Sequence, residues 1–368
     1  MTAYVSADGA YGGPVAVALD QAAALTDLGH TVTVAAGWDG LEPPAGPARL
    51  RLFRARKPLR SSFVGLFAPG LLLWVARHAQ EFDVVHVHVT RDLVTLPAAA
   101  IARRRGVPVV LQPHGQIRAG RSRAQGLVDR VLGARVLRGS AAVLALTPQE
   151  DRDLRDLGVP ADRVHRLENA VPPAPEHARP ADHGALVLYS SRLAERKRPR
   201  AFVAAAEIVS RDRPDARFEI WGADAGERAA TLDDIERRGL TGRCVYRGAT
   251  TVERSRARLA DAAVLVLPSR AEPFPMALLE AFAAGLPAVI TEETGLSRLA
   301  RETGAAVVTD GSPARLAEGI LRLLDDPDLW LRTARSARAL ADVRFSPDRI
   351  AGRLTDIYQR VVAGGRRP

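Results

Sequence analysis

Two glutamates in the second half of the chain have the spacing that most strongly indicates chemistry. Glu272 and Glu280 lie eight positions apart in LPSRAEPFPMALLEA, which follows an apolar run ending at Leu267. The pattern predicts a buried strand, a loop that carries Glu272, and a helix that begins near Pro275, because proline is tolerated at the first helical position. Both carboxylates can then reach a ligand at the helix N-terminus, where free N–H groups suit an anion or a diphosphate. The alternative to ligand binding is that Glu272 only caps the loop and that Glu280 is a solvated helix residue.

A basic cluster upstream is the second candidate. In SRLAERKRP, Arg192 and Lys197 come between a predicted strand at 185–189 and a predicted helix at 199–211. This is the carboxyl end of a strand, where an arginine fork and a lysine point charge suit a pair of phosphates. Only two of the 52 basic residues are lysines, and Lys197 is one of them, which favours a position that needs a compact ammonium. An exposed basic turn is the alternative.

Two motifs in the first half of the chain are weaker. Gly12 and Gly13, in DGAYGGP, follow a short first strand and allow backbone N–H groups to approach a ligand closely. The spacing is not GxGxxG, so a dinucleotide site is not expected. His114 follows a predicted strand at 107–112 and can donate a hydrogen bond to a substrate hydroxyl. A tight turn and an ordinary loop histidine are the alternatives.

The sequence predicts no metal site. His86 and His88 share one face of a predicted strand, but their spacing fixes no third or fourth ligand. Asp151 and Asp153 form a D-x-D string, which we interpret as the solvated surface of an amphipathic helix. The single cysteine, Cys244, rules out an intrachain disulfide and a four-cysteine zinc site, and it favours a cytoplasmic location.

Alternating strands and helices position these motifs. The predicted strands are mostly continuous apolar runs, which are typical of strands buried on both faces of a parallel sheet. They lie at 30–36, 83–89, 107–112, 141–146, 185–189, 216–221, 243–247, 263–267 and 287–291. Amphipathic runs at 14–28, 199–211 and 275–284 predict helices between them. The alternation predicts an α/β protein with doubly wound sheets.

A proline-rich seam divides the chain of 368 residues. Four prolines between Asn169 and Pro180 can continue neither a helix nor a central strand. We predict a Rossmann-like domain over 1–172, a linker over 173–183 and a second Rossmann-like domain over 184–346, with a helix in 347–368 packing back on the first domain. Because ligands bind outside the carboxyl ends of such strands, the cleft between the two sheets is the expected site. The first strand is unusually short, which is compatible with a truncated N-terminus.

Positive charge is concentrated in one stretch. The net charge is +10, and the segment from Arg49 to Arg138 alone carries 17 Lys and Arg against 4 Asp and Glu. This excess favours an anionic partner such as a phospholipid surface. Six apolar residues of the segment are candidates for docking on lipid: Phe63, Leu66, Phe67, Leu71, Leu72 and Trp74. An ordinary core helix over 71–75 is the alternative, and no run reaches the about 18 apolar residues that a membrane span needs.

The four motifs, in this order, resemble retaining glycosyltransferases of the GT4 family, and the resemblance covers nearly the whole chain. The family has the GT-B fold, two facing Rossmann-like domains with the active site in the interdomain cleft. The resemblance implies that Glu272 binds hydroxyls of the donor sugar and that Glu280 binds the ribose of the nucleotide. Arg192 and Lys197 would hold the donor diphosphate and stabilise it as a leaving group. His114 would contact the sugar.

The resemblance also assigns backbone contacts. The amides of Gly12 and Gly13 would face the phosphates. Family members often have glycines around the phenylalanine after the first glutamate, whereas this chain has prolines without an N–H at 273 and 275. The remaining backbone donors are those of Phe274, Met276 and Ala277. Of the glycine-rich turn after the second strand of that domain, only Gly222 is kept, so the base is not predicted.

The resemblance implies a retaining, metal-independent enzyme of the hexosyltransferase type, without a cofactor, that moves a sugar from a nucleotide-diphosphate sugar to an acceptor hydroxyl. Many relatives act on lipid-linked acceptors at the cytoplasmic face of the membrane. We therefore expect a role in glycolipid, cell-envelope or exopolysaccharide synthesis and a peripheral location at the inner face of the plasma membrane. The alternatives are a soluble glycosyltransferase of a small natural-product or sugar acceptor, a nucleotide-sugar epimerase, and a nucleic-acid-binding protein. Nucleic acid is not expected, because no reading motif is recognisable and aromatic residues are only 5 %.

Overall fold

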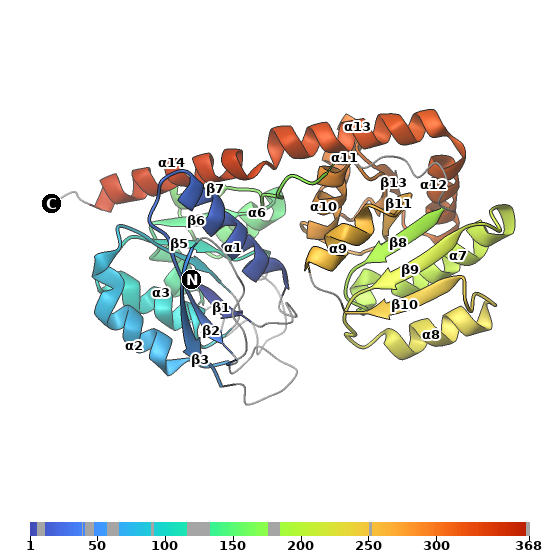
Figure 1. Ribbon diagram of the computed structural model, residues 1–368. Coiled ribbons are helices and arrows are strands. Elements are labelled where there is room, and N and C mark those ends of the chain that lie inside the picture. The colour runs from blue at the N-terminus through green and yellow to red at the C-terminus, as the bar shows by residue number, and fades with distance from the viewer. Residues whose placement is uncertain are drawn as a thin grey trace. The chain divides into compact units, whose positions relative to one another are not determined.

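The computed structural model describes residues 1–5, 12–38, 40, 48–56, 66–89, 92–115, 133–175, 185–249 and 252–365. The chain divides into two compact units (Figure 1). Unit 1 consists of Met1–Ala170 and Pro347–Pro368, and unit 2 of Val171–Ser346. Each unit is an α/β structure in which all neighbouring named strands are parallel.

Unit 1 contains two parallel sheets. One has the order β1-β2-β3, with the strands Thr2–Val5, Thr33–Trp38 and Arg49–Arg54. The other has the order β4-β5-β6-β7, with the strands Val85–His88, Val109–Gln112, Ala142–Ala145 and Val164–Arg166. Met1 links the two sheets, because its amine donates to the His86 carbonyl (2.5 Å) and its carbonyl accepts from the His88 N–H (2.9 Å).

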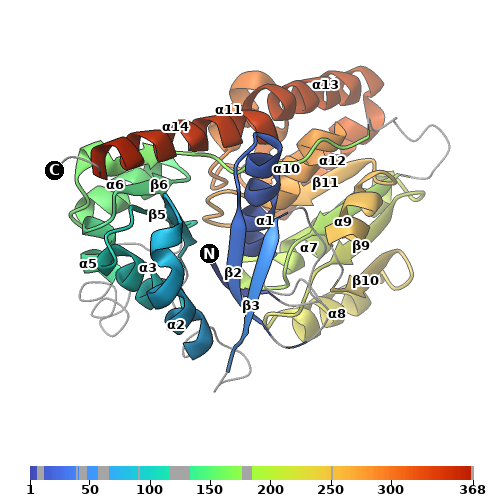
Figure 2. The same cartoon turned by 60° about the vertical axis from the view of Figure 1, so that its left-hand side comes forward.

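Helices cover both faces of the β4–β7 sheet. Val110 of β5 packs with α1 (Gly12–Asp27) and α14 (Pro347–Gly365), whereas Val109 and Leu111 pack with α2 (Pro69–His78) and α3 (Thr95–Arg104). Figure 2 shows α2 and α3 along these strands. Burial on both faces explains why the two interior strands, β5 and β6, are largely continuous apolar runs. In the described part of unit 1, the remaining helical elements are Ala79–Glu81, Ala134–Arg138 (α5), Pro148–Asp156 (α6) and Ala161–Arg163.

The described residues of unit 2 form a single sheet of the order β10-β9-β8-β11-β12-β13. In chain order, β8 to β13 are Leu186–Ser190, Arg217–Trp221, Cys244–Gly248, Val264–Leu267, Ala288–Thr291 and Val307–Thr309. This is the doubly wound order 3-2-1-4-5-6. The strands stay parallel, but the chain adds successive strands to one side of β8 up to β10 and then to its other side from β11 onward, so the order reverses between β8 and β11. The loops that leave the carboxyl ends of these two strands therefore flank the point where ligands bind in such sheets.

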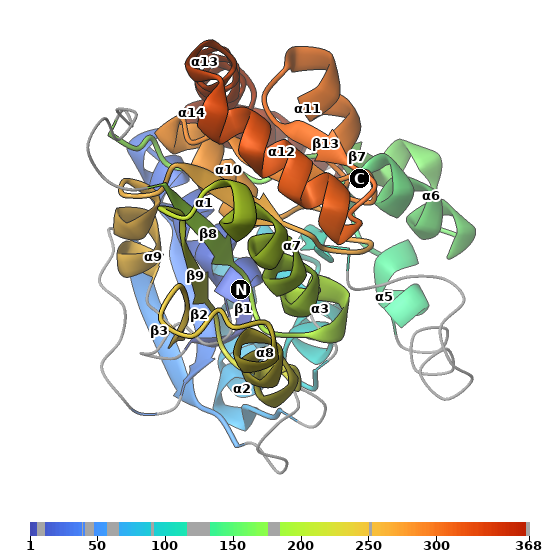
Figure 3. The ribbon, with the colours of Figure 1, turned by 90° about the vertical axis from the view of Figure 1, so that its right-hand side faces the viewer.

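Two helix layers enclose the sheet of unit 2. α7 (Pro199–Asp212) and α12 (Pro313–Asp325) pack side by side on one face, as Figure 3 shows, and bury Phe202 and Ile320 against the strands. α10 (Met276–Ala284) packs against α13 (Pro327–Arg344). The other helical elements are Glu195–Lys197, Arg228–Arg237 (α8), Val252–Leu259 (α9) and Ser297–Thr303 (α11).

The nine strands listed above and the short first strand, β1, are present, and the ends of the nine shift by at most three residues. Three further strands, β3, β7 and β13, were not predicted, and each lies at the edge of its sheet. β3 and β7 contain polar residues and so lack the continuous apolar run on which the prediction relied, and β13 is only three residues long. In β3, for example, exposed arginines are interleaved with partly buried leucines.

The apolar residues proposed for lipid docking are largely part of the core of unit 1. Leu66 and Leu71 are fully buried, so that interpretation is wrong for both. Leu72 and Trp74 are partly buried against the same core, and α2 is the core helix of the alternative interpretation. Phe67 is exposed, and Phe63 lies outside the described residues. Within the described ranges, no helix is long and apolar enough to cross a membrane.

Candidate functional site

The basic motif forms a compact turn directly after β8. The turn ends in the short helix Glu195–Lys197, and Arg198 then takes a left-handed conformation (φ 53°) at the start of α7. The buried Tyr189 hydroxyl lies 3.2 Å from the carbonyl oxygen of Arg192 and 3.3 Å from that of Lys197. Burial, followed by the charge of Glu272, raises the pKa of Tyr189, so the phenol stays a donor that ties both ends of the turn.

Glu272 of the loop after β11 contacts this turn. Lys197 Nζ and Arg196 Nη1 both donate to Glu272 Oε2, the latter at 3.1 Å. The Lys197 and Glu272 side chains are only 11 % and 9 % exposed, so the ion pair is largely buried. Burial lowers the pKa of Lys197, and the Glu272 carboxylate opposes that shift. The strand order thus joins two predicted motifs that lie 75 residues apart in the chain.

The loop that carries Glu272 is held in place by the loop after β12. The Gly295 N–H donates to the Glu272 carbonyl at 2.8 Å. A Cβ atom at Gly295 would clash with the carbonyl oxygen of Pro273, so the two loops approach more closely than any other residue allows. Ala271 has φ 46°, which is uncommon for a residue with a side chain. Strained backbone of this kind persists where surrounding structure fixes it, and it is frequent at functional sites.

Gly222 supports the basic turn from the strand β9 side. A Cβ atom there would clash with the carbonyl oxygen of Ser191, so only glycine fits. The Gly222 N–H donates to the carbonyl of Gly248 (2.8 Å), and the Gly222 carbonyl accepts from the Tyr246 hydroxyl (2.9 Å). The glycine that the sequence singled out is therefore needed for the close approach of two loops.

The backbone donors predicted after Glu272 lie at the start of α10. Pro275 is the N-cap and Met276 the first helical residue, one position later than the sequence predicted. Met276 and Ala277 therefore provide N–H groups of the first helical turn. The Phe274 side chain is buried, and its ring packs edge-on against Phe345 at 5.8 Å between centroids. This contact anchors the loop in the core of unit 2.

Glu280 lies on α10, and its carboxylate has a cationic partner. Arg256 Nε of α9 is 3.4 Å from Glu280 Oε1. Their side chains are 35 % and 13 % exposed, so the carboxylate is mostly shielded from solvent. Nothing in the sequence pattern predicted Arg256, because the pairing depends on how α9 and α10 pack.

His114 occupies the turn after β5 in unit 1, with φ 54°. Its Nε2 lies 2.9 Å from Nδ1 of the buried His88, and the adjacent Gly115 N–H donates to the Glu150 carboxylate at 2.5 Å. Burial lowers the pKa of His114 to about 3, so the imidazole is neutral at pH 7. The contact with His88 occupies one ring nitrogen and fixes the orientation of the ring. His88 was considered only as a metal ligand, not as a partner of His114.

The glycine motif of unit 1 is described only in part. Gly12 and Gly13 are the first two residues of α1, and a Cβ atom at Gly13 would meet no other atom within 4 Å. The preceding residues of the motif lie outside the described ranges. The phosphate contacts that the resemblance implies for Gly12 and Gly13 therefore stay predictions.

The residues considered as metal ligands have protein partners. His86 Nδ1 lies 2.7 Å from the Tyr358 hydroxyl, and His88 contacts His114. Asp151 pairs with Arg155 along α6. Among the described residues, no three His, Cys, Asp or Glu side chains are grouped so that they could hold a metal ion.

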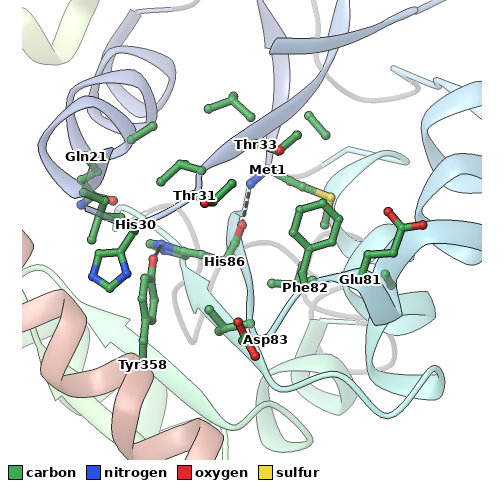
Figure 4. A pocket seen from close by; sticks show the side chains of 18 of the residues that line it. Met1, Gln21, His30, Thr31, Thr33, Glu81, Phe82, Asp83, His86 and Tyr358 are labelled. Carbon is green, nitrogen blue, oxygen red and sulfur yellow. Dashed lines mark hydrogen bonds between the residues drawn. The ribbon is translucent and has the colours of Figure 1, made fainter. Parts of the chain in front are cut away.

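A cavity of about 710 Å³ lies within unit 1 (Figure 4). Residues of α1, α2, α14, β2 and β4 line it, among them Gln21, His86 and Tyr358, together with His30 of the loop after α1. None of the predicted site residues lines this cavity, although His88, the partner of His114, does. The cavity is therefore separate from the motifs that predict the donor site, and it adjoins the His86 and His88 pair.

Comparisons with known proteins assign both units to glycosyltransferase families. Residues 175–340 match the family described as glycosyl transferases group 1, and residues 12–170 match the glycosyl transferase 4-like domain. The α-D-kanosaminyltransferase of Streptomyces kanamyceticus is 30 % identical over 325 residues, which cover 81 % of this chain and 84 % of that protein. D-inositol 3-phosphate glycosyltransferase 1 of Catenulispora acidiphila is 30 % identical over 352 residues, or 88 % of this chain and 81 % of that protein.

Solved structures share the fold over almost the full length. HepE of Anabaena, solved in complex with UDP and glucose, has a TM-score of 0.75 at 20 % identity and covers 97 % of this chain and 99 % of its own. Sucrose-phosphate synthase of Thermosynechococcus elongatus has a TM-score of 0.77 at 20 % identity, covering 99 % of both chains. The two Rossmann-like units thus define a protein of the GT-B fold. The chain belongs to the group 1 glycosyltransferases, as the sequence predicted.

Proposed function

We propose that this glycosyltransferase takes a sugar from a nucleoside-diphosphate sugar that binds at the carboxyl ends of β8 and β11. The observation that carries the proposal is the convergence of Lys197, Arg196 and Glu272 at the reversal point of the unit 2 sheet. The cations suit a diphosphate, and the carboxylate suits sugar hydroxyls. That HepE was solved with UDP and with UDP-glucose supports a donor of this class.

The individual roles follow from position. Lys197 and Arg192 would bind the diphosphate and stabilise the charge that develops on it as it leaves. Glu272 would accept from hydroxyls of the sugar, and Glu280 would bind the ribose. The backbone N–H groups of Phe274, Met276 and Ala277 would complete the donor site in unit 2. The turn at Gly222 would also contribute to it. The resemblance to the family also assigns backbone amides that face the phosphates to Gly12 and Gly13, and a sugar contact to His114.

We expect that transfer retains the anomeric configuration and needs no metal or other cofactor. Lys197 and Arg192 can neutralise the leaving diphosphate, and in such a reaction the leaving phosphate helps to deprotonate the acceptor on the same face of the sugar. Transfer in the presence of EDTA, with the first-formed product followed by proton NMR, tests both points. A product of inverted configuration contradicts retention, and activity that EDTA abolishes and Mg²⁺ restores contradicts metal independence.

A thermal-shift panel tests the donor class. UDP, GDP, ADP and TDP are added with and without their common sugars, and glucose with inorganic phosphate is the control. One nucleotide series is expected to stabilise the protein, by about 2.7 kcal/mol at a ligand concentration of a hundred times Kd. The control mixture should have no effect. If no nucleotide stabilises the chain, the proposed donor site is wrong.

We further propose a lipid-linked acceptor in glycolipid, cell-envelope or exopolysaccharide synthesis, at the cytoplasmic face of the plasma membrane. The supporting observation is that the edge strand β3 exposes Arg49, Arg51 and Arg54, within the strongly basic segment that extends to Arg138. Arginines on a surface strand attract anionic head groups. Binding to anionic vesicles at low salt is expected to exceed binding to neutral vesicles, and equal binding would contradict the proposal.

A small, soluble acceptor is the second candidate. The similarity to α-D-kanosaminyltransferase, and to 2-deoxystreptamine glucosyltransferase of Streptomyces kanamyceticus at 28 % identity, favours a natural-product or sugar acceptor. This candidate predicts no preference for anionic vesicles. The vesicle experiment therefore separates the two acceptor classes.

A further inference from the structure

We propose that Arg196 is a positioning residue for the donor sugar, because it holds Glu272 in place when Lys197 turns to the donor diphosphate. The inference rests on the proposed function, in which Glu272 meets sugar hydroxyls and Lys197 meets phosphate. The glycosyltransferase resemblance assigned no role to Arg196, although it lies directly before Lys197.

The two cations share one oxygen of the carboxylate. Arg196 and Lys197 both donate to Glu272 Oε2. No described residue donates a hydrogen bond to the other oxygen, Oε1. One oxygen is thus held by the protein, and the other is available to accept from a ligand hydroxyl. A carboxylate fixed at one oxygen presents the second in a defined direction.

Donor binding brings a second negatively charged group, the diphosphate, to the Lys197 ammonium. An ammonium has three donors and no acceptor, so a diphosphate that arrives beside it competes with Glu272 for the same group. A carboxylate that is 9 % exposed would then lose its nearest counter-ion, and an unpaired charge at such a site is unfavourable. A guanidinium can compensate, because it is always charged and bonds to carboxylates in a planar fork.

Arg196 is suited to hold the Glu272 carboxylate, because its side chain contacts that carboxylate from the solvent-exposed side of the turn. Its side chain is 46 % exposed, so it can follow a small movement of Glu272. The neighbouring cations contact other groups: Arg198 Nη1 donates to the carbonyl of Pro268 (3.4 Å), and Arg270 lies 4.0 Å from Glu293. Among the described residues, Arg196 is the only arginine that contacts Glu272.

The test compares Arg196→Ala with Arg270→Ala, which removes the same charge from the same neighbourhood without a Glu272 contact. Affinities are measured by calorimetry for the nucleoside diphosphate that stabilises the wild type most and for its sugar conjugate. For Arg196→Ala, Kd of the nucleotide sugar is expected to rise about five- to tenfold, while Kd of the bare nucleotide stays within about twofold. Arg196→Lys should restore part of the loss, and Arg270→Ala should bind both ligands as the wild type does.

Lys197→Ala separates failure of the inference from failure of the proposed function. If Lys197→Ala binds both ligands normally, the donor site itself is wrong. If that variant loses both ligands and Arg196→Ala matches Arg270→Ala, the positioning role of Arg196 is overturned. The role is also overturned if Arg196→Ala weakens the bare nucleotide as much as the nucleotide sugar, since Arg196 would then be a phosphate ligand. Because Arg196 is a surface residue, its variants are expected to fold.

Discussion

The Lys197→Ala variant is expected to lower kcat/KM for glycosyl transfer by about 10²- to 10³-fold, the usual effect of removing one preorganised donor to a developing negative charge. The ammonium lies at the carboxyl end of β8, largely buried and already paired with a carboxylate. Burial places this charge in a site of low dielectric, where it contributes far more than it does in water. Initial rates with the donor identified by the nucleotide panel measure the loss.

Folding and catalysis can be separated in this variant. Removing Lys197 leaves the Glu272 carboxylate with Arg196 as its partner, so some loss of stability is expected. In the double variant Lys197→Ala, Glu272→Ala, both charges of the buried pair are absent, and we expect a thermal stability closer to that of the wild type. Activity should not return with stability. Normal turnover by the single variant would show that neither the leaving group nor the diphosphate depends on Lys197.

The sequence predicted every interior strand of the sheets, and also the edge strands β4 and β10. Two buried faces require apolar residues at consecutive positions, and this pattern is visible without knowledge of the neighbours. Of the three strands that were not predicted, β3 and β7 contain polar residues among the apolar ones, and β13 is only three residues long. The basic strand Arg49–Arg54 illustrates the difference, because its arginines were counted as charge and not as part of a strand.

The main candidates for the site were predicted because strand ends are visible in the sequence. Lys197 was singled out by the scarcity of lysine, and Glu272 by its place after an apolar run. Their contact could not be predicted, because it depends on β8 and β11 being neighbours in a sheet where β9 and β10 come between them in the chain. Arg196 was missed for a related reason: in a run of three cations, the sequence does not tell which one faces a carboxylate.

The apolar segment around α2 was misinterpreted for the opposite reason. Leu66 and Leu71 lie among arginines in the sequence, which suggested an amphipathic surface for lipid. In the structure, α2 packs between β3 and α3, and these leucines face inward. Composition alone does not separate a buried face from a lipid-facing one, since both are apolar.

The Gly222→Ala variant is expected to lose about 2–4 kcal/mol of stability and most of its affinity for the donor. The added Cβ would clash with the carbonyl oxygen of Ser191, a backbone atom that cannot rotate away as a flexible side chain can. To accommodate it, the turn that carries Arg192 and Lys197 must move. Urea unfolding measures the first effect, and nucleotide thermal shift measures the second.

Gly226→Ala is the matched control in the same loop between β9 and α8. Gly226 also has a positive φ, 107°, but a Cβ atom there would meet nothing within 4 Å. This variant isolates the conformational cost of a side chain at positive φ, about 1–2 kcal/mol, and leaves the basic turn where it is. Donor binding should therefore survive in Gly226→Ala and fail in Gly222→Ala. Equal donor affinity in both variants would mean that the position of the turn after β8 does not depend on its close approach to β9, and that Gly222 is kept for its backbone conformation alone.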